Sequence, residues 1–561
     1  MRSIDSVSLR NFSGRPEALT GRAAAGALRY YIVPDLALVA SLITLFYCLF
    51  LFGGYQKLFR DSDAGWHIRT GESILSTRTL PHTDPYSFTR SGQPWFAWEW
   101  GSDALSGAAY MAGGLSGIAL FYALAIAAGV WLWFKLTWML GGNFLLACLF
   151  AAPMLSTTNI HWLARPHVLS WLLLLAMLIG AEKVGRTPWS AAGPLAGLLP
   201  RELKFVHDPE RPTRASAADR GGRPTWLVAA TLTAVWANLH ASFFLAPLIC
   251  IIYAVAHALR PLIWNLDSGQ EWSKARWFGC AAAVCAAASL LNPYGWQLHR
   301  HLLHYLADTD LMARIGEFQS FNFHAEGAFQ IVLTLGIGML GAAMALGQKQ
   351  LAHFLLSAVL LYAALRSARG LPLVALALLP IANAAMARAL TSATNLRPAL
   401  RRAIDAVLAY SGGLRAIDAR FSGLALAPVF ALLVFALLRT PAIAARTGFP
   451  PDQFPVAAAA EVEKLAPTAR ILAPDKFGGY LIYRFQGTRK VFFDGRSDLY
   501  GSEFLKQYAR LTQLRPGWRA QLDEFGFTHA LLPNDYSLVP ALEALGWKRL
   551  YGDETATLLA R

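Results

Sequence analysis

Long apolar stretches recur along the chain from Tyr30 to Leu438. A stretch of roughly 17–25 apolar residues is long enough to cross about 30 Å of hydrocarbon as a helix. A mean hydropathy of +0.37 and a charged fraction of only 15% are likewise unusual for a soluble protein of this length. The sequence after Thr440, in contrast, has the composition of a soluble domain. We therefore expect an α-helical polytopic membrane domain, residues 32–440, followed by a soluble α/β domain, residues 441–561.

The apolar stretches predict about eleven transmembrane helices. The two shortest apolar stretches, 143–159 and 225–239, are also compatible with re-entrant segments. The expected spans are 32–53, 113–135, 143–159, 167–182, 225–239, 241–258, 277–291, 328–346, 350–365, 370–387 and 422–438.

The distribution of basic residues predicts the orientation. Cytoplasmic loops concentrate Lys and Arg, and the segments rich in them are 1–31, 183–223, 260–276 and 388–420. With eleven spans and a cytoplasmic N-terminus, all four fall inside, and the C-terminal domain falls outside. The net charge of +15 is thereby explained without a nucleic-acid partner. The first apolar run exceeds the 7–15 residues of a signal-peptide core, so we expect an uncleaved anchor and a location in a bacterial inner (cytoplasmic) membrane.

The first outer loop, residues 54–103, is too long for a simple connection and interleaves acids, a histidine and tryptophans. Asp61 and Asp63, followed by His67, are suited to a general base, a metal ligand pair or a sugar-binding rim. Asp84 and Glu99 add further carboxylates. An exposed, solvated loop is the plain alternative.

Polar clusters from distant segments are predicted at the same outer face as this loop. Ionisable residues at membrane depth usually face a cavity, a partner or a substrate, although each of these also has a structural interpretation as a helix end or a headgroup contact. We take the joint clustering to indicate a binding site. Its candidate members are Arg165, His167, Asn238, His240, Tyr294, Glu317, Arg366 and Arg369.

The soluble region alternates helical runs with strand-like runs. The expected helices are 457–465, 504–511 and 538–545, and the expected strands are 470–473, 490–493 and 529–532. Asp494-Gly495-Arg496 follows the second of these strands. A glycine between opposite charges suits a tight turn, so we favour a buried Asp–Arg pair there over binding residues.

Arginines near the membrane surface opposite a carboxylate-bearing loop suit a lipid phosphate beside an acid. The favoured hypothesis is glycosyl transfer from a lipid-phosphate sugar, in which the acid deprotonates the acceptor hydroxyl or holds a divalent cation such as Mg or Mn. The alternatives are a transporter or flippase of lipid-linked substrates and a non-catalytic envelope assembly protein. Transporters tend to show internal repeats and midplane charges, which the sequence lacks.

With Asp61-Ser62-Asp63 in the first outer loop, about eleven spans and an outer soluble domain, the chain resembles the GT-C superfamily of polytopic glycosyltransferases. The resemblance implies an inverting enzyme that transfers a sugar from a polyprenyl-phosphate-linked donor to a glycan, lipid or protein acceptor on the outer face. It also implies that Asp63 is the catalytic base. Relatives commonly pair adjacent acids, whereas Ser62 separates them here, so Asp61 remains the alternative.

A closer likeness is to an uncharacterised group of bacterial membrane proteins. It rests on Asp63 to Glu72, Pro81 to Ser87, Arg165-Pro166-His167, Trp236 to His240, Asn292 to Gly295, Gly478-Gly479-Tyr480 and Asp494 to Tyr500. It supports the architecture over most of the chain and does not identify a substrate.

Overall fold

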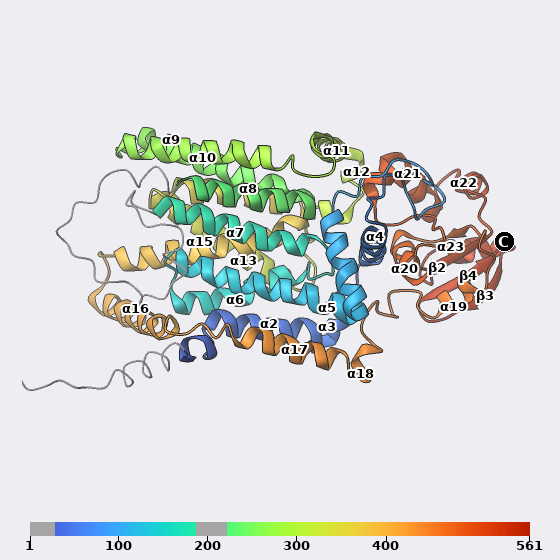
Figure 1. Cartoon of the computed structure of the whole chain (residues 1–561), viewed down its shortest axis with the longest axis horizontal. Coiled ribbons are helices and arrows are strands. Elements are labelled where there is room, and N and C mark those ends of the chain that lie inside the picture. The colour runs from blue at the N-terminus through green and yellow to red at the C-terminus, as the bar shows by residue number, and fades with distance from the viewer. Residues whose placement is uncertain (1–27, 187–221) are drawn as a thin grey trace, which may run out of the picture.

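The computed structural model describes residues 28–186 and 222–561. It consists of a bundle of long helices and a smaller C-terminal domain with a sheet, placed at one end of the bundle (Figure 1). The predicted fold class, a bundle of apolar helices with a C-terminal α/β part, is confirmed. Most of segment 1–31 and of the basic loop 183–223 lies outside the described residues.

A helix corresponds to each of the eleven predicted spans. They are α2 (Leu36–Phe50), α5 (Trp100–Met139), α6 (Phe144–Asn159), α7 (His167–Arg186), α8 (Gly222–Leu239), α9 (Leu245–Ile263), α10 (Ser268–Ala288), α13 (Ala328–Gly347), α14 (Leu351–Arg366), α15 (Leu371–Ser392) and α17 (Leu426–Leu438). Among the described residues, six segments are long and apolar enough to cross a membrane: 36–57, 100–139, 167–184, 241–263, 328–347 and 368–392. Four shorter apolar helices accompany them.

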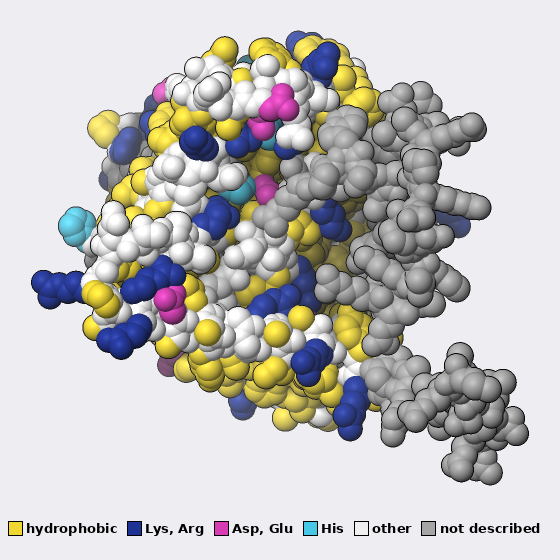
Figure 2. Space-filling model, turned by 90° about the vertical axis from the view of Figure 1, so that its left-hand side faces the viewer, with side chains coloured by type: hydrophobic (Ala, Val, Ile, Leu, Met, Phe, Trp, Pro, Cys, Tyr) yellow, Lys and Arg dark blue, Asp and Glu magenta, His cyan; other side chains and the backbone are white. Residues whose placement is uncertain are grey.

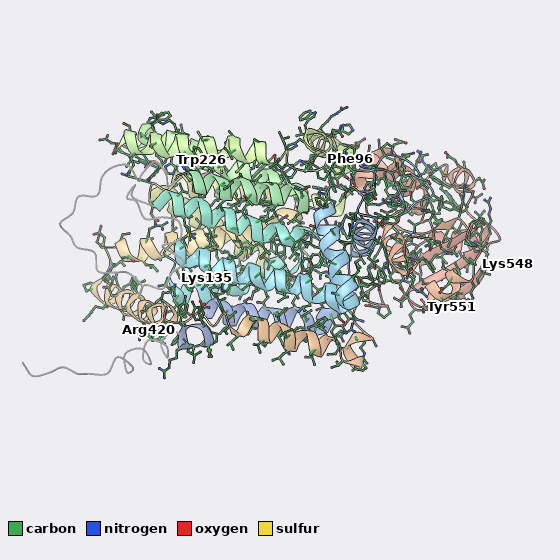
Figure 3. The ribbon with its side chains drawn as sticks, in the orientation of Figure 1. Phe96, Lys135, Trp226, Arg420, Lys548 and Tyr551 are labelled. Atoms are coloured by element: carbon green, nitrogen blue, oxygen red, sulfur yellow. The ribbon has the colours of Figure 1, made fainter. Side chains whose placement is uncertain are left out.

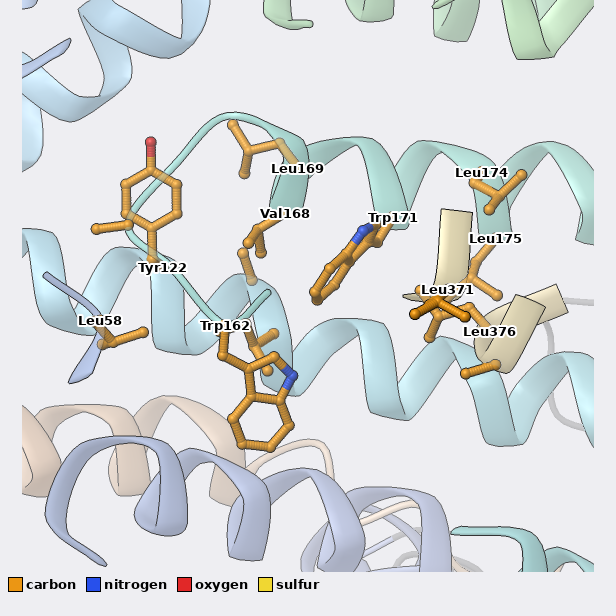
Figure 4. Close-up of a cluster of buried hydrophobic side chains, with 14 of the residues drawn as sticks. Leu58, Tyr122, Trp162, Val168, Leu169, Trp171, Leu174, Leu175, Leu371 and Leu376 are labelled. Carbon is orange, nitrogen blue, oxygen red and sulfur yellow. The ribbon is translucent and has the colours of Figure 1, made fainter. Parts of the chain in front are cut away.

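The core of the bundle is formed around α5, α7 and α15. α15 is apolar on all sides, and 89% of its apolar segment is buried, as expected for a helix surrounded by others. Figure 4 shows part of this core, where Tyr122, Trp171 and Leu376 lie in one cluster of buried side chains. Such packing fixes the ends of the helices relative to one another, and the candidate site lies at one of these ends.

The first outer loop folds into helices that lie across the end of the bundle. It contains α3 (Gly54–Lys57) and α4 (Asp63–Thr77), and it leads into α5, which bends at Gly114, where φ is 60°. In Figure 1, α4 is seen end-on beside the first part of α5. The two helices cross at Gly71 and Gly107, where a Cβ atom would collide with the opposite backbone. The expectation that this loop has its own structure is confirmed.

The described connections lie at two opposite ends of the bundle. Figure 3 labels Lys135 and Arg420 at one end and Phe96 at the other, beside the C-terminal domain. The basic helix α16 (Pro398–Asp418) lies at the first end. Loop segments at the second end include the short helices α11 (Trp296–Ala307), α12 (Thr309–Met312), η3 (Ala241–Phe244), η4 (Gly316–Phe318), η5 (Ala368–Gly370), η1 (Leu51–Gly53) and α18 (Pro441–Ala444).

The C-terminal domain is built on a four-stranded sheet of order β1-β2-β4-β3, with β1 and β2 parallel and the other pairs antiparallel. The strands are β1 (Ile471–Leu472), β2 (His529–Pro533), β3 (Lys548–Gly552) and β4 (Ala556–Ala560). The helices are α19 (Ala458–Glu463), α20 (Asp475–Arg484), α21 (Ser497–Thr512), α22 (Trp518–Glu524) and α23 (Leu538–Ala544).

One predicted strand of this domain is wrong. Segment 490–493 does not join the sheet. Val491 instead pairs with the first outer loop: its N–H donates to Tyr86 O at 2.9 Å, and its carbonyl accepts from Phe88 N at 3.0 Å. The apolar run is strand-like because it is buried and extended. Its hydrogen-bonding partner is a segment about 400 residues earlier in the chain, which local sequence does not reveal.

Candidate functional site

The two acids of the first loop stand where the chain enters α4. Asp61 Oδ1 accepts the backbone N–H of Asp63 at 2.9 Å, which satisfies a donor at the start of the helix. Asp63 is the first residue of α4, where the positive end of the helix dipole favours a carboxylate. The spacing of two residues therefore gives the acids different environments. Asp61 helps to start the helix, and Asp63 projects from its first turn.

Arg165 brings these acids together with a third. Its Nη1 lies 2.7 Å from Asp61 Oδ2 and 3.4 Å from Glu317 Oε1, and its Nη2 lies 2.7 Å from Asp63 Oδ2. The planar guanidinium offers donors in a fixed fork, which suits several carboxylates at once. Arg165 comes from the α6–α7 connection, so three distant segments meet at this one side chain.

Glu317 continues the network to Arg369. Arg369 Nη2 lies 2.6 Å from Glu317 Oε2, and its guanidinium stacks over Phe318. Beside this network is a cavity of about 790 Å³. The candidate residues that line it are Asp61, Asp63, Arg165, Glu317 and Arg369. Five of the thirteen predicted site residues thus meet at one cavity.

The C-terminal domain forms a wall of this cavity. Gly495 packs so closely on Asp63 that a Cβ atom at position 495 would stand 1.8 Å from Asp63 Oδ1. Helix α20 meets α4 in the same way, because a Cβ at Gly65 would stand 2.2 Å from Gly479 O. Only glycine allows these approaches. The soluble domain is therefore part of the site and encloses Asp63, whose side chain is 8% exposed.

Burial sets the protonation behaviour of these groups. Burial raises the pKa of Asp63 to about 7, against the lowering effect of Arg165. Burial opposes ionisation of Glu317 as well, but Arg165 and Arg369 outweigh it and hold its pKa below the usual range. Burial lowers the pKa of Arg165, but the nearby carboxylates of Asp61 and Asp63 raise it by more than burial lowers it. Arg165 therefore stays charged. Among the three carboxyls that contact Arg165, Asp63 is thus the one with a pKa near neutral pH.

A second polar cluster lies one turn further along α4. His67 Nδ1 is 2.6 Å from Asp103 Oδ1, and Glu99 lies 3.8 Å from His67 Nε2 and 3.5 Å from His240 Nε2. Burial raises the pKa of Glu99 to about 8 and lowers that of His67. His67 Nε2 and Asp103 Oδ2 have no hydrogen-bond partner among the described residues. The cluster brings together three of the candidate residues, His67, Glu99 and His240, but none of them lines the cavity.

The remaining candidates are placed elsewhere at the same end. His167 Nε2 lies 2.8 Å from His161 O, Asn238 accepts from Trp100 Nε1 at 2.8 Å, and Tyr294 accepts from Ala97 N at 3.0 Å. These contacts hold helix ends and loops in position. Arg366 is exposed at the end of α14 and does not line the cavity.

Asp84 belongs to a buried joint between the first loop and the C-terminal domain. Arg496 Nη2 lies 2.8 Å from Asp84 Oδ1 and 2.7 Å from Asp494 Oδ2, and Tyr500 donates to Asp494. The Arg496 guanidinium also lies over the Trp95 ring, 4.6 Å from its centroid. The predicted buried Asp–Arg pair is confirmed. It holds the turn that brings Gly495 to Asp63.

The cavity also includes residues that sequence reasoning missed. They are Arg60, Arg314, Asp475, Lys476 and Gly495. Arg60 directly precedes Asp61, and Asp475-Lys476 directly precedes Phe477 and Gly478-Gly479-Tyr480, a motif already singled out. The only sequence signal that could have identified Arg60, Asp475 and Lys476 was that they adjoin these motifs. Nothing in the sequence indicated that the C-terminal domain folds back onto α4.

These residues do not fit a divalent cation as they stand. The three carboxylates that converge, from Asp61, Asp63 and Glu317, are arranged around the guanidinium of Arg165. No group of three or more His, Cys, Asp or Glu residues within 28–186 and 222–561 is arranged to hold a metal ion. The positive charge at the centre of the acids is supplied by an arginine.

Comparison with solved structures identifies the fold. The oligosaccharyltransferase of Archaeoglobus fulgidus, tethered with an acceptor peptide containing the NVT sequon, aligns over 89% of this chain and 68% of its own with a TM-score of 0.52 and 11% identity. The archaeal oligosaccharyltransferase AglB from Archaeoglobus fulgidus, in complex with an inhibitory peptide and a dolichol-phosphate, gives a TM-score of 0.52 at 11% identity, over 89% of this chain and 69% of its own.

A looser alignment relates the chain to ArnT from Cupriavidus metallidurans bound to undecaprenyl phosphate, with a TM-score of 0.37, 12% identity and coverage of 96% and 98%. The sequence matches no protein-family model and no curated protein. At these identities the likeness to the oligosaccharyltransferase concerns the fold. The expected architecture, a bundle of apolar helices followed by a C-terminal α/β domain, is confirmed, and its fold is similar to that of this oligosaccharyltransferase.

Proposed function

We propose that this protein is a membrane glycosyltransferase that moves a sugar from a polyprenyl-phosphate-linked donor to an acceptor on the outer face of the membrane. The observation that carries the proposal is Asp63, a buried carboxyl with a pKa of about 7, placed on a cavity of about 790 Å³ beside Arg165. The shared fold with AglB, which was solved with a dolichol-phosphate, supports this class of donor.

In the proposed reaction Asp63 is the general base. The acceptor hydroxyl gives its proton to the Asp63 carboxylate as its oxygen bonds to the anomeric carbon of the donor sugar. The bond from that carbon to the phosphate oxygen breaks, and polyprenyl phosphate leaves with the electron pair. A direct displacement of this kind inverts the anomeric configuration. A positioned general base whose pKa is close to the working pH typically accelerates a reaction 10²–10⁴-fold.

Asp61 and Arg165 act as positioning residues in this scheme. Asp61 accepts the N–H of Asp63 and shares Arg165 with it, so both fix the base in place. This assignment favours Asp63 over Asp61 as the base, because Asp61 already has two bonding roles. The donors of Arg165 face three carboxylates, so it is less suited to hold the donor phosphate than the sequence alone suggested.

The leaving phosphate requires other cations. Arg314, Arg369 and Lys476 line the same cavity from three different segments of the chain. Arg314 is exposed, and the Arg369 side chain is 38% exposed, so both can reach a headgroup that enters from the membrane surface. Arginine and phosphate form strong charge-assisted hydrogen bonds. We assign the phosphate to these residues, and the sugar to the space between them and Asp63.

The proposal includes an orientation of the protein in the membrane. Helix α4, whose first residue lines the cavity, and the C-terminal domain lie at the end of the bundle opposite helix α16 and the α9–α10 connection. If the basic end is cytoplasmic, as the distribution of Lys and Arg indicates, the reaction takes place on the non-cytoplasmic face of a bacterial inner membrane.

The test is sugar transfer in proteoliposomes with a panel of polyprenyl-phosphate sugars. The native protein is compared with Asp63→Asn, which keeps the shape of the side chain but removes the base, and with Asp61→Asn. Glu72→Gln is the matched control, because Glu72 lies on the same helix, is paired with Arg69 and does not line the cavity.

We expect Asp63→Asn to lose at least 100-fold in kcat, as expected for a general base, and Glu72→Gln to retain its activity. Full activity in Asp63→Asn would remove the assignment of the base. Movement of the lipid-linked sugar across the bilayer without transfer would favour a flippase. Folded protein that neither transfers nor moves any donor, and that is recovered with envelope partners, would favour an assembly role.

A further inference from the structure

A second polar cavity lies at the other end of the bundle, far from the acidic site. It has a volume of about 310 Å³ and is formed where α7, α9, α10, α14 and α15 end or begin. The side chains that line it include His257, Arg260, Glu271, Lys274 and His353. Most of them are buried, and ionisable groups buried at membrane depth are costly unless they serve a ligand or a partner.

Both acids of this cavity are paired with neighbouring side chains. Glu271 accepts two hydrogen bonds from Arg260 Nη1, at 2.9 and 3.0 Å, and lies 2.7 Å from His257 Nδ1. Glu182 accepts from Tyr253 at 2.5 Å and lies 2.8 Å from His353 Nε2. Each carboxylate thus already has a basic or hydroxyl partner inside the protein.

The remaining charge is positive. Arg260, Lys274 and Arg388 are three cations against two carboxylates, before either histidine is protonated. Lys274 makes no ion pair with any residue that the structure describes. His353 is 5% exposed, and its Nδ1 has no hydrogen-bond partner in the described part of the chain. The cavity therefore presents one ammonium without an ion-pair partner and one buried ring nitrogen without a hydrogen-bond partner among the described residues.

The surroundings favour an anion as well. Figure 2 looks onto this end of the molecule and shows basic side chains spread over it, with few acidic ones between them. Basic pockets between transmembrane helices at a membrane surface are suited to the phosphate of a lipid headgroup.

We propose that this cavity is a binding site for a phosphate group, carried either by an anionic phospholipid or by a soluble phosphate. Lys274 is the principal contact, and the buried, unpartnered Nδ1 of His353 is a second contact. Because each basic residue near a membrane surface contributes about 1 kcal/mol, loss of Lys274 weakens binding about fivefold.

The test uses the full-length protein in nanodiscs. Thermal unfolding is followed in phosphatidylcholine alone, in phosphatidylcholine with added inorganic phosphate, and in mixtures that contain phosphatidylglycerol. Bound phosphatidylglycerol is also counted by native mass spectrometry. Lys274→Gln is compared with Arg276→Gln, which removes the same charge from an exposed position on the same helix outside the cavity. His353→Gln provides an independent second variant.

We expect the unfolding temperature of the native protein and of Arg276→Gln to rise with one of the probes, and the rise to be reduced in Lys274→Gln and His353→Gln. A response to inorganic phosphate identifies a soluble ligand, and a response to phosphatidylglycerol alone identifies a lipid. No response to either probe, or an equal response in Lys274→Gln and Arg276→Gln, would overturn the proposal.

Discussion

Replacement of Gly495 by alanine tests the link between the C-terminal domain and the proposed base. The added Cβ would stand 1.8 Å from Asp63 Oδ1 and 2.7 Å from its Cγ, and the three atoms nearest to it all belong to Asp63. Cβ atoms essentially never approach other atoms within 3.0 Å, so the carboxylate must move by at least about 1.2 Å. A displacement of about 1 Å can cost 10²-fold in rate. We expect kcat for sugar transfer to fall about 100-fold.

The stability of the same variant provides a second measure. Overpacking typically costs 1–3 kcal/mol, and here the cost should largely disappear in an Asp63→Ala background, because the colliding atoms are gone. Gly552→Ala is the control, since it adds the same methyl group to the same domain with only ordinary contacts at 3.7 Å or more. Native transfer activity and native unfolding in Gly495→Ala would refute the reasoning, because they would mean that Gly495 does not pack on Asp63.

Three further predictions follow from the same contacts. Because Asp63 acts deprotonated and burial raises its pKa to about 7, kcat/KM should rise with pH through about 7 and then level off; a flat profile from mildly acidic to mildly alkaline pH would contradict the assignment. Arg496→Met should destabilise the protein by about 3–5 kcal/mol in chemical unfolding, because Asp84 and Asp494 lose their buried partner; unchanged stability would show that the joint is unimportant. Dialysis against EDTA should leave transfer intact, since Arg165 takes the central position among the acids; loss restored by Mg²⁺ or Mn²⁺ would contradict this.

The helical bundle was predictable because each apolar stretch must satisfy its own backbone as a helix, and the basic loops fix which ends lie together. That placed Arg165 and Glu317 at the same face as Asp63 before any contact was known. The length of α5 was underestimated, because its first part, before Gly114, lies across the end of the bundle and is partly polar.

The contacts between the domains were not predictable. Asp84 looked like a substrate ligand, whereas Arg496, 412 residues later, binds it in a buried joint. The close packing of Gly495 on Asp63 likewise depends on the tertiary fold, since a glycine between two charges predicts only a tight turn. Local sequence identified which residues are unusual, and the fold determined which of them meet.

The most direct test of the central claim is a cryo-EM structure of the protein with bound polyprenyl phosphate. The account predicts the phosphate in the cavity beside Asp63, within hydrogen-bonding distance of at least one of Arg314, Arg369 and Lys476. A phosphate bound elsewhere, for example only in the basic cavity at the opposite end of the bundle, would contradict the proposed active site.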